Sequence, residues 1–274
     1  MAEKSGDEGL VQGAVLKVAG KATLPFQAAR ADRSFGTAFW YNDLVESAAD
    51  REVVRQYLVT AERRTRYEIG QFTLREGLAE PELPADELVL PGFAKKWRPL
   101  GNLGVAAMPT TDLHIHAERK GWSWATHEVT AGLAARPDDI ALLGDEPLPA
   151  YALGHEVVDA PDSAVPDRPQ ALVAGAVTRP DPELLARWAG PVPAGFDGAP
   201  VFAALPTGEE QVKLVCLGLL LAAVDEPSAD GPGGPEVPGA PGSGPGGSVV
   251  TFDLLRPGIH ALTPARGRHW WQRG

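Results

Sequence analysis

The chain has 274 residues, 44 % of them hydrophobic, and its 36 carboxylates against 25 lysines and arginines give a formal net charge of -11. This negative field repels polyanions, so we expect no nucleic-acid partner. Residues 1–9 are charged and lack the apolar centre of a signal peptide, and no apolar run approaches the length of a membrane span. We therefore expect no membrane association either.

Cysteine usage indicates the compartment. Cys216 is the single cysteine, so the chain cannot form an internal disulfide. Many secreted proteins of comparable fold are stapled by disulfides, and we therefore expect a cytoplasmic protein with a reduced thiol. Because Cys216 lies in the apolar run 214–217, we expect it to be buried rather than reactive. The abundance of Ala, Gly, Pro and Arg favours a bacterial source of high GC content.

Strand patterns dominate and come in short pieces bounded by Gly, Pro and Asp. We expect residues 1–12 to be a flexible N-terminus. Residues 13–112 should form one β-rich half and residues 113–265 a second. The strands predicted for the first half are 14–18, 35–41, 53–60, 67–74 and 103–108. Those predicted for the second half are 122–129, 140–143, 152–158, 171–178, 199–205, 212–221 and 249–254.

Helix signals are few. Residues 111–120 are predicted to be helical, with Thr110 or Thr111 as the capping residue. Residues 182–188 are predicted to be helical as well, because Asp181 is a capping residue and proline follows at the first helical position. The predicted fold class is therefore all-β with little helix.

Two segments have an unusual composition. Residues 226–248 are nearly all Gly, Pro, Ser and Ala, so they cannot bury enough apolar surface to order, and we predict a disordered insertion in the second half. It would either obstruct or tether a ligand site, or be a tolerated surface loop. The tail 266–274 is basic and aromatic, and would either dock a partner or pack on its own chain.

Metal and cofactor signals are weak. His114 and His116 are two residues apart and point to different sides of the predicted helix, so they cannot share a metal there. On a strand they would share a face, and His127 could join them. We expect no metal site and no cofactor.

Three segments in order carry a family pattern, each with one key residue replaced. Residues 57–63 read Tyr-Leu-Val-Thr-Ala-Glu-Arg, residues 97–109 contain Gly-Asn-Leu-Gly-Val-Ala, and residues 195–202 read Gly-Phe-Asp-Gly-Ala-Pro-Val-Phe. They resemble the histidine, aspartate and serine segments of trypsin/chymotrypsin-like serine proteases, in the order found in that family. Arg63, Asn102 and Asp197 then stand at the three triad positions, and Gly195 with Asp197 at the positions that form the oxyanion loop.

The resemblance covers about residues 15–262 and is strongest with cytosolic bacterial trypsin-like peptidases. Further similar segments are 36–39, 110–124, 151–156 and 170–178. The resemblance implies two packed antiparallel β-barrels of six strands each, with a short helix between them. It also implies a cleft that receives an extended peptide by strand addition.

The replacements remove the family's chemistry. Arg63 cannot act as a base, because a guanidinium has donors only and no lone pair to offer. A carboxylate at position 197 is a poor acyl-transfer nucleophile and opposes an oxyanion beside it. Arg63 and Asp197 could instead form a charge-assisted hydrogen bond, with the Asn102 amide oxygen also accepting from the guanidinium. The three replaced side chains could form a structural strut or merely fill space, and the sequence leaves both alternatives open.

We therefore expect a catalytically inactive homologue that binds a protein or peptide or acts as a scaffold. The alternative is an active peptidase with a relocated nucleophile. Its candidates are Ser248, Ser163 or Ser123 beside His155 or His127.

Overall fold

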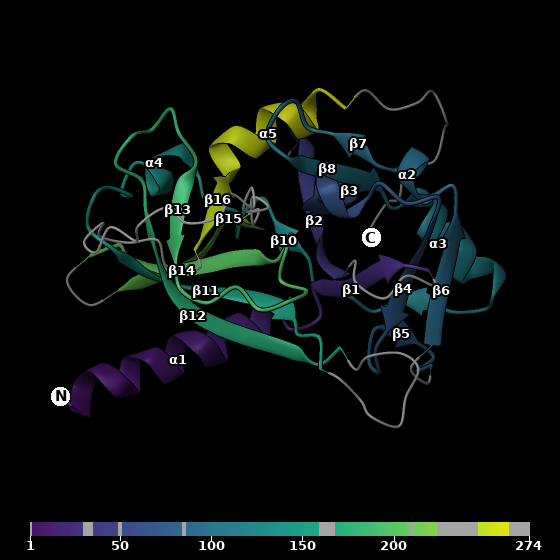
Figure 1. Cartoon of the computed structure of the whole chain (residues 1–274), viewed down its shortest axis with the longest axis horizontal. Coiled ribbons are helices and arrows are strands. Elements are labelled where there is room, and N and C mark those ends of the chain that lie inside the picture. Colours follow the sequence, from purple (N-terminus) through teal and green to yellow (C-terminus); the bar gives the residue numbers. More distant parts are fainter. Residues whose placement is uncertain are drawn as a thin grey trace, which may run out of the picture.

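The computed structural model describes residues 2–29, 35–48, 51–83, 86–158, 168–208, 211–223 and 246–262. Two large β-sheets lie side by side with helices around them, which confirms the all-β class (Figure 1). The strands of the first sheet are β1 Thr23–Ala28, β2 Phe35–Ala48, β3 Arg51–Ala61, β4 Ile69–Leu74, β6 Asp86–Pro91, β7 Arg98–Pro99, β8 Val105–Pro109 and β10 Val129–Thr130. The strands of the second sheet are β11 Leu148–His155, β12 Gln170–Thr178, β13 Ala186–Ala189, β14 Pro200–Pro206, β15 Val212–Ala222 and β16 Gly247–Thr251.

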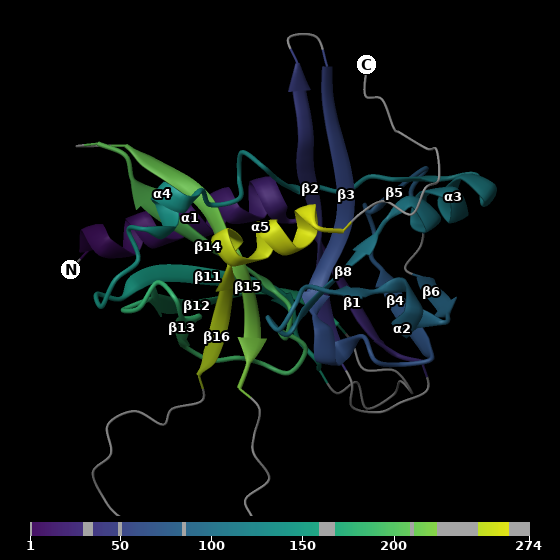
Figure 2. The ribbon, with the colours of Figure 1, turned by 90° about the horizontal axis from the view of Figure 1, so that it is seen from above.

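The first sheet is a curled half-barrel. Its strand order is β6-β4-β1-β2-β3-β8-β7, and β10 adds in parallel to β2. In the described part of the chain it has eight strands and stays open, where six strands in a closed barrel were expected. The two edges do not meet, because β7 has only two residues and β6 pairs with β4 alone. The long hairpin of β2 and β3 projects beyond the body of the molecule (Figure 2).

The second sheet closes into the six-stranded barrel that was expected, in the order β11-β12-β13-β16-β15-β14. The apolar run in β15 is buried on both faces. Val215 and Leu217 point to the cluster inside the barrel, whereas Cys216 and Leu219 join the cluster shared with α1, the first sheet and α5 Phe252–His260. A strand buried on both sides needs a continuous rather than an alternating apolar sequence.

The strand predicted at residues 14–18 was wrong, because residues 2–19 form helix α1 Ala2–Ala19. Residues 2–12, which were expected to be flexible, belong to the same helix. Val11, Val15 and Ala19 are four residues apart, so they line one side of the helix. Val15 and Ala19 are fully buried, and α1 packs beside the second barrel against β14 and β15 (Figure 1). Tertiary burial of this stripe therefore stabilises a helix whose first turns are polar.

The helix expected at 111–120 is confirmed as α3 Thr111–Arg119, but it belongs with the first sheet. Leu113 and Ala117 pack into the cluster that also holds Trp40 and Phe72. The next strands, β9 Ser123–Trp124 and β10, pair with β5 Ala79–Glu80 and β2. The chain therefore remains beside the first sheet as far as β10, which ends at residue 130.

Two local predictions in the second half were also wrong. No strand forms at 140–143, because residue 140 is the last of helix α4 Pro137–Ile140 and a turn follows. The Asp139 carboxylate caps the first turn of α4 by accepting from the Arg136 amide at 2.8 Å. The helix expected at 182–188 is a turn followed by β13. The Asp181 carboxylate accepts from the Glu183 amide at 2.8 Å, which closes the turn without starting a helix.

The expected insertion 226–248 lies mostly outside the described residues, and so does the tail 266–274. The last two positions of the predicted insertion, Gly247 and Ser248, belong to β16 and pair with β13 and β15. The remaining helix of one turn is α2 Phe93–Lys96, and α5 follows β16 directly. None of the helices in the described ranges is both long and apolar enough to cross a membrane.

Candidate functional site

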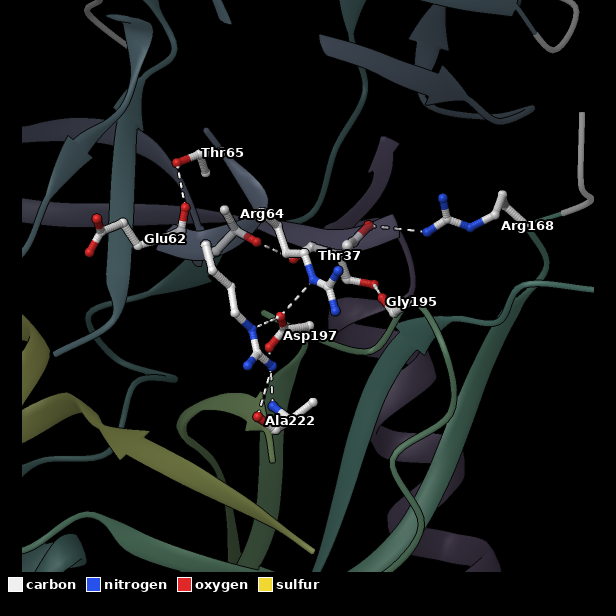
Figure 3. Close-up of polar contacts among 11 residues, drawn as sticks. Thr37, Glu62, Arg64, Thr65, Arg168, Gly195, Asp197 and Ala222 are labelled. Carbon is white, nitrogen blue, oxygen red and sulfur yellow. Dashed lines mark hydrogen bonds and ion pairs between the residues drawn. The ribbon is translucent and has the colours of Figure 1, made fainter. Parts of the chain in front are cut away.

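The three segments with the family pattern supply a site at the junction of the two sheets. Arg63 and Arg64 lie on the 3-10 turn η1 Glu62–Arg64, directly after β3. Asp197 lies in the loop before β14, and Ala222 is the last residue of β15. Figure 3 shows Asp197 between Arg64 and Ala222. Elements far apart in the sequence therefore meet at this carboxylate.

Glycines let the Asp197 loop approach the first sheet. Gly195 and Gly198 have φ of 95° and 93°, the left-handed region that other residues rarely adopt. A Cβ on Gly198 would collide with the Thr60 hydroxyl and the Thr37 carbonyl. The Thr37 amide donates to the Asp197 carbonyl at 3.0 Å, and the Thr37 hydroxyl donates to the Gly195 carbonyl at 2.7 Å. Backbone contacts to β2 thus fix the position of Asp197.

The Asp197 carboxylate accepts three hydrogen bonds. Arg63 Nε donates to Oδ2 at 2.6 Å and Arg64 Nε donates to the same oxygen at 2.8 Å. The Ala222 amide donates to Oδ1 at 3.1 Å. The carboxylate is 2 % exposed, whereas the two arginine side chains are 31 % and 29 % exposed. The expected contact between Arg63 and Asp197 is therefore confirmed.

Asn102 does not take the role expected for its side chain. It is exposed in the turn before β8, and within the described residues no hydrogen bond joins it to Arg63. Arg63 Nη2 donates instead to the Ala222 carbonyl at 2.7 Å. The turn itself does lie beside η1, since the Glu62 amide donates to the Gly104 carbonyl at 2.8 Å. The backbone of this segment is near the site while the amide side chain is not part of it.

Arg64 is the site residue that the sequence analysis missed. The available signal was the arginine doublet 63–64, since a tight turn can direct neighbouring side chains to one acceptor. The adjacent acid Glu62 does not join the cluster. Its carboxylate pairs with Arg66 at 2.8 Å, and the Arg66 side chain is 70 % exposed.

His155 is fully buried, and its amide donates to the Thr37 hydroxyl at 3.2 Å. Its Nε2 is 3.0 Å from the Thr23 hydroxyl and its Nδ1 is 3.1 Å from the Arg168 carbonyl. Burial, with the positive charge of Arg75 as the second cause, lowers the pKa of His155 to about 3. The imidazole is therefore neutral near pH 7.

Two of the candidate nucleophiles for a relocated site, Ser123 and Ser248, lie within the described residues. Ser123 donates to the Glu80 carbonyl at 3.3 Å, and Ser248 sits within the β16 ladder. His127 Nδ1 accepts from the Lys21 amide at 3.3 Å. Among the described residues no hydrogen bond joins a serine hydroxyl to a histidine ring. Ser163 lies outside the described residues.

The remaining candidates have structural surroundings. His114 and His116 are on α3, and His114 Nε2 is 2.6 Å from Gln56 Oε1. No group of three or more potential metal ligands occurs in the described ranges of the chain. Cys216 is buried, which raises the pKa of its thiol. Phe196, the neighbour of Asp197 in the chain, is buried in the second barrel, where a Cβ on Gly154 would lie 2.7 Å from its ring.

No protein-family model matches the chain, and no curated protein matches it. Similar solved structures are serine proteases. The HtrA-type protease AlgW with tripeptide is 14 % identical, with a TM-score of 0.43 and coverage of 90 % of this chain and 62 % of that one. The serine endoprotease from Yersinia pestis is 10 % identical, with a TM-score of 0.46 and coverage of 90 % and 64 %. The chain thus spans less than two thirds of their length, and likeness at this level assigns no activity to it.

Proposed function

We propose that the chain is a catalytically inactive relative of trypsin-like serine proteases that acts by binding a protein or peptide. The observation that carries the proposal is that the Asp197 carboxylate accepts three hydrogen bonds from the protein. Asp197 is the residue that the family resemblance aligns with the nucleophile. It is almost fully buried and accepts from Arg63, Arg64 and the Ala222 amide. A group held in this way cannot attack a carbonyl, and its charge opposes an oxyanion at the same place.

The neighbouring groups supply no base for hydrolysis. The Arg63 guanidinium has donors only and no lone pair to accept a proton. His155 is neutral, but both ring nitrogens face protein groups and its side chain is inaccessible to solvent. A general base must reach the proton of a nucleophile, directly or through one water. These contacts favour a binding role over hydrolysis, with the site retained as a structural junction.

A labelling experiment tests the inactivity. The purified protein should hydrolyse no peptide or ester substrate and should not react with a fluorophosphonate probe, whereas trypsin in the same assay should do both. Labelling of the native protein that disappears in Ser248→Ala or Ser163→Ala would establish a relocated nucleophile instead. A cytoplasmic location is part of the proposal, and fractionation of the native cell checks it.

A capture experiment tests the binding role. Ala223 is exposed directly after β15, next to the Asp197 site, and Ala223→Trp places an indole there. Ala141→Trp places the same side chain at the exposed end of α4 and is the matched control. A ligand of this site should be retained by the native protein and by Ala141→Trp but lost with Ala223→Trp. Equal retention by all three would argue against binding at the junction.

A further inference from the structure

The charges at the Asp197 site do not cancel. Two guanidinium groups share one carboxylate, so the cluster carries a net charge of +1. Glu62 does not neutralise it, because its carboxylate is paired with Arg66 at 2.8 Å. This local positive charge lies in a chain whose formal net charge is -11. An uncompensated cation of this kind attracts an anionic group.

Several guanidinium donors of the cluster remain free. In contacts with the described residues, Arg63 uses Nε and Nη2, which leaves Nη1, and Arg64 uses only Nε, which leaves both Nη atoms. These three nitrogens are accessible to solvent, since none of them is among the buried side-chain atoms that lack a partner in the described residues. About a third of each side chain is exposed, at 31 % and 29 %. The free donors therefore face solvent, where a ligand can reach them.

The anchoring of both arginines reduces the cost of binding. Each guanidinium is planar, and its Nε contact to Oδ2 of Asp197 limits the orientation of that plane. A side chain that is already oriented loses less conformational freedom when a ligand arrives. The fork of nitrogen donors on a guanidinium matches the two oxygens of a carboxylate.

We propose that Arg63 and Arg64 form a binding site for a carboxylate of a peptide ligand, provided by an acidic side chain or by the C-terminus. The inference rests on the proposed binding function and names the chemistry that the site recognises. One carboxylate brings the two guanidinium charges into balance with Asp197, whereas a phosphate dianion would leave an excess negative charge. A singly charged oxyanion is therefore the better match.

The test uses the full-length protein and three pentapeptides that differ in whether and where they carry a carboxylate. The first is acetylated and amidated with a central glutamate, the second has glutamine in its place, and the third is acetylated pentaalanine with a free C-terminus. Binding is followed by NMR through the Nε–Hε signals of Arg63 and Arg64, assigned by their loss in Arg63→Lys and Arg64→Lys. A peptide with a carboxylate should shift both signals, and the glutamine peptide should bind about tenfold more weakly.

Variants separate the contact from the fold. Arg64→Gln should weaken binding of the carboxylate peptide about tenfold. Arg119→Gln, which removes an exposed arginine at the end of α3, should leave the affinity unchanged. Arg64→Lys keeps the charge and should bind with intermediate affinity, because it lacks the fork. A folded Arg64→Lys or Arg64→Gln protein that binds like the native one would overturn the inference.

The remaining outcomes also decide the question. If glutamate and glutamine peptides bind equally and leave both signals in place, the carboxylate site is wrong while peptide binding stands. If none of the peptides shifts the signals, the carboxylate site is likewise wrong, and the capture experiment decides the binding role independently. Inorganic phosphate is the last probe, and saturation at concentrations as low as those of the carboxylate peptide would overturn the choice of a peptide carboxylate.

Discussion

Removing the Asp197 carboxylate should destabilise the protein more than removing either arginine. Asp197→Ala deletes acceptors at 2.6, 2.8 and 3.1 Å from their donors. The two guanidinium groups are about a third exposed, so water compensates part of the loss, and we expect a cost of about 3 kcal/mol. Because Asp197 has two arginine partners, we expect its loss to cost more than the loss of either arginine.

Each single arginine substitution should cost less, because the other arginine still neutralises Asp197. We expect about 1 kcal/mol for Arg63→Gln and for Arg64→Gln. The double variant leaves a carboxylate that is 2 % exposed with only the Ala222 amide, and it should cost about 4 kcal/mol. The coupling between the two arginines is then about 2 kcal/mol.

Urea unfolding measures these differences. Tryptophan fluorescence and far-ultraviolet circular dichroism should report the same transition, which justifies two-state values. Arg66→Gln is the control, since its pair with Glu62 is largely exposed and should contribute less than about 0.5 kcal/mol. If the losses for Arg63→Gln and Arg64→Gln add to within about 0.5 kcal/mol, the shared carboxylate does not couple them and the reasoning is refuted.

Two further predictions concern His155 and Gly198. Burial lowers the pKa of His155 to about 3, below its unfolded value of about 6.5, so the unfolded state binds more protons between these values and stability falls as the pH drops through that range. The free energy of unfolding of the native protein should lose about 2 kcal/mol more between pH 6.5 and 5 than that of His155→Gln, and parallel pH profiles would contradict this. Gly198→Ala should cost more than about 3 kcal/mol by urea unfolding, because φ is 93° and the new Cβ meets Thr60 and Thr37. Gly208→Ala has no neighbour within 4 Å and should be nearly neutral, and an equal cost for the two would show that the close approach at Gly198 is not limiting.

The sequence determined the class of fold and one contact of the site. Short apolar pieces bounded by Gly and Pro indicate strands because β-structure depends on local alternation or on apolar runs. The contact of Arg63 with Asp197 could be expected because the segments 57–63 and 195–202 resemble two segments that meet in trypsin-like proteases, and they occur in the same order along the chain. The first prediction is a property of local sequence, and the second rests on a resemblance that spans most of the chain.

Only the tertiary structure decided what those local patterns pack against. Residues 2–19 form a helix because Val15 and Ala19 are buried against the second barrel, and no local signal specifies that surface. Arg64 joins Asp197, and Asn102 does not, because the direction of each side chain follows from turns at the junction of two sheets. Such contacts join residues more than a hundred positions apart, as in the 133 positions between Arg64 and Asp197. Their geometry is set by the packing of the sheets, which no short window of the sequence contains.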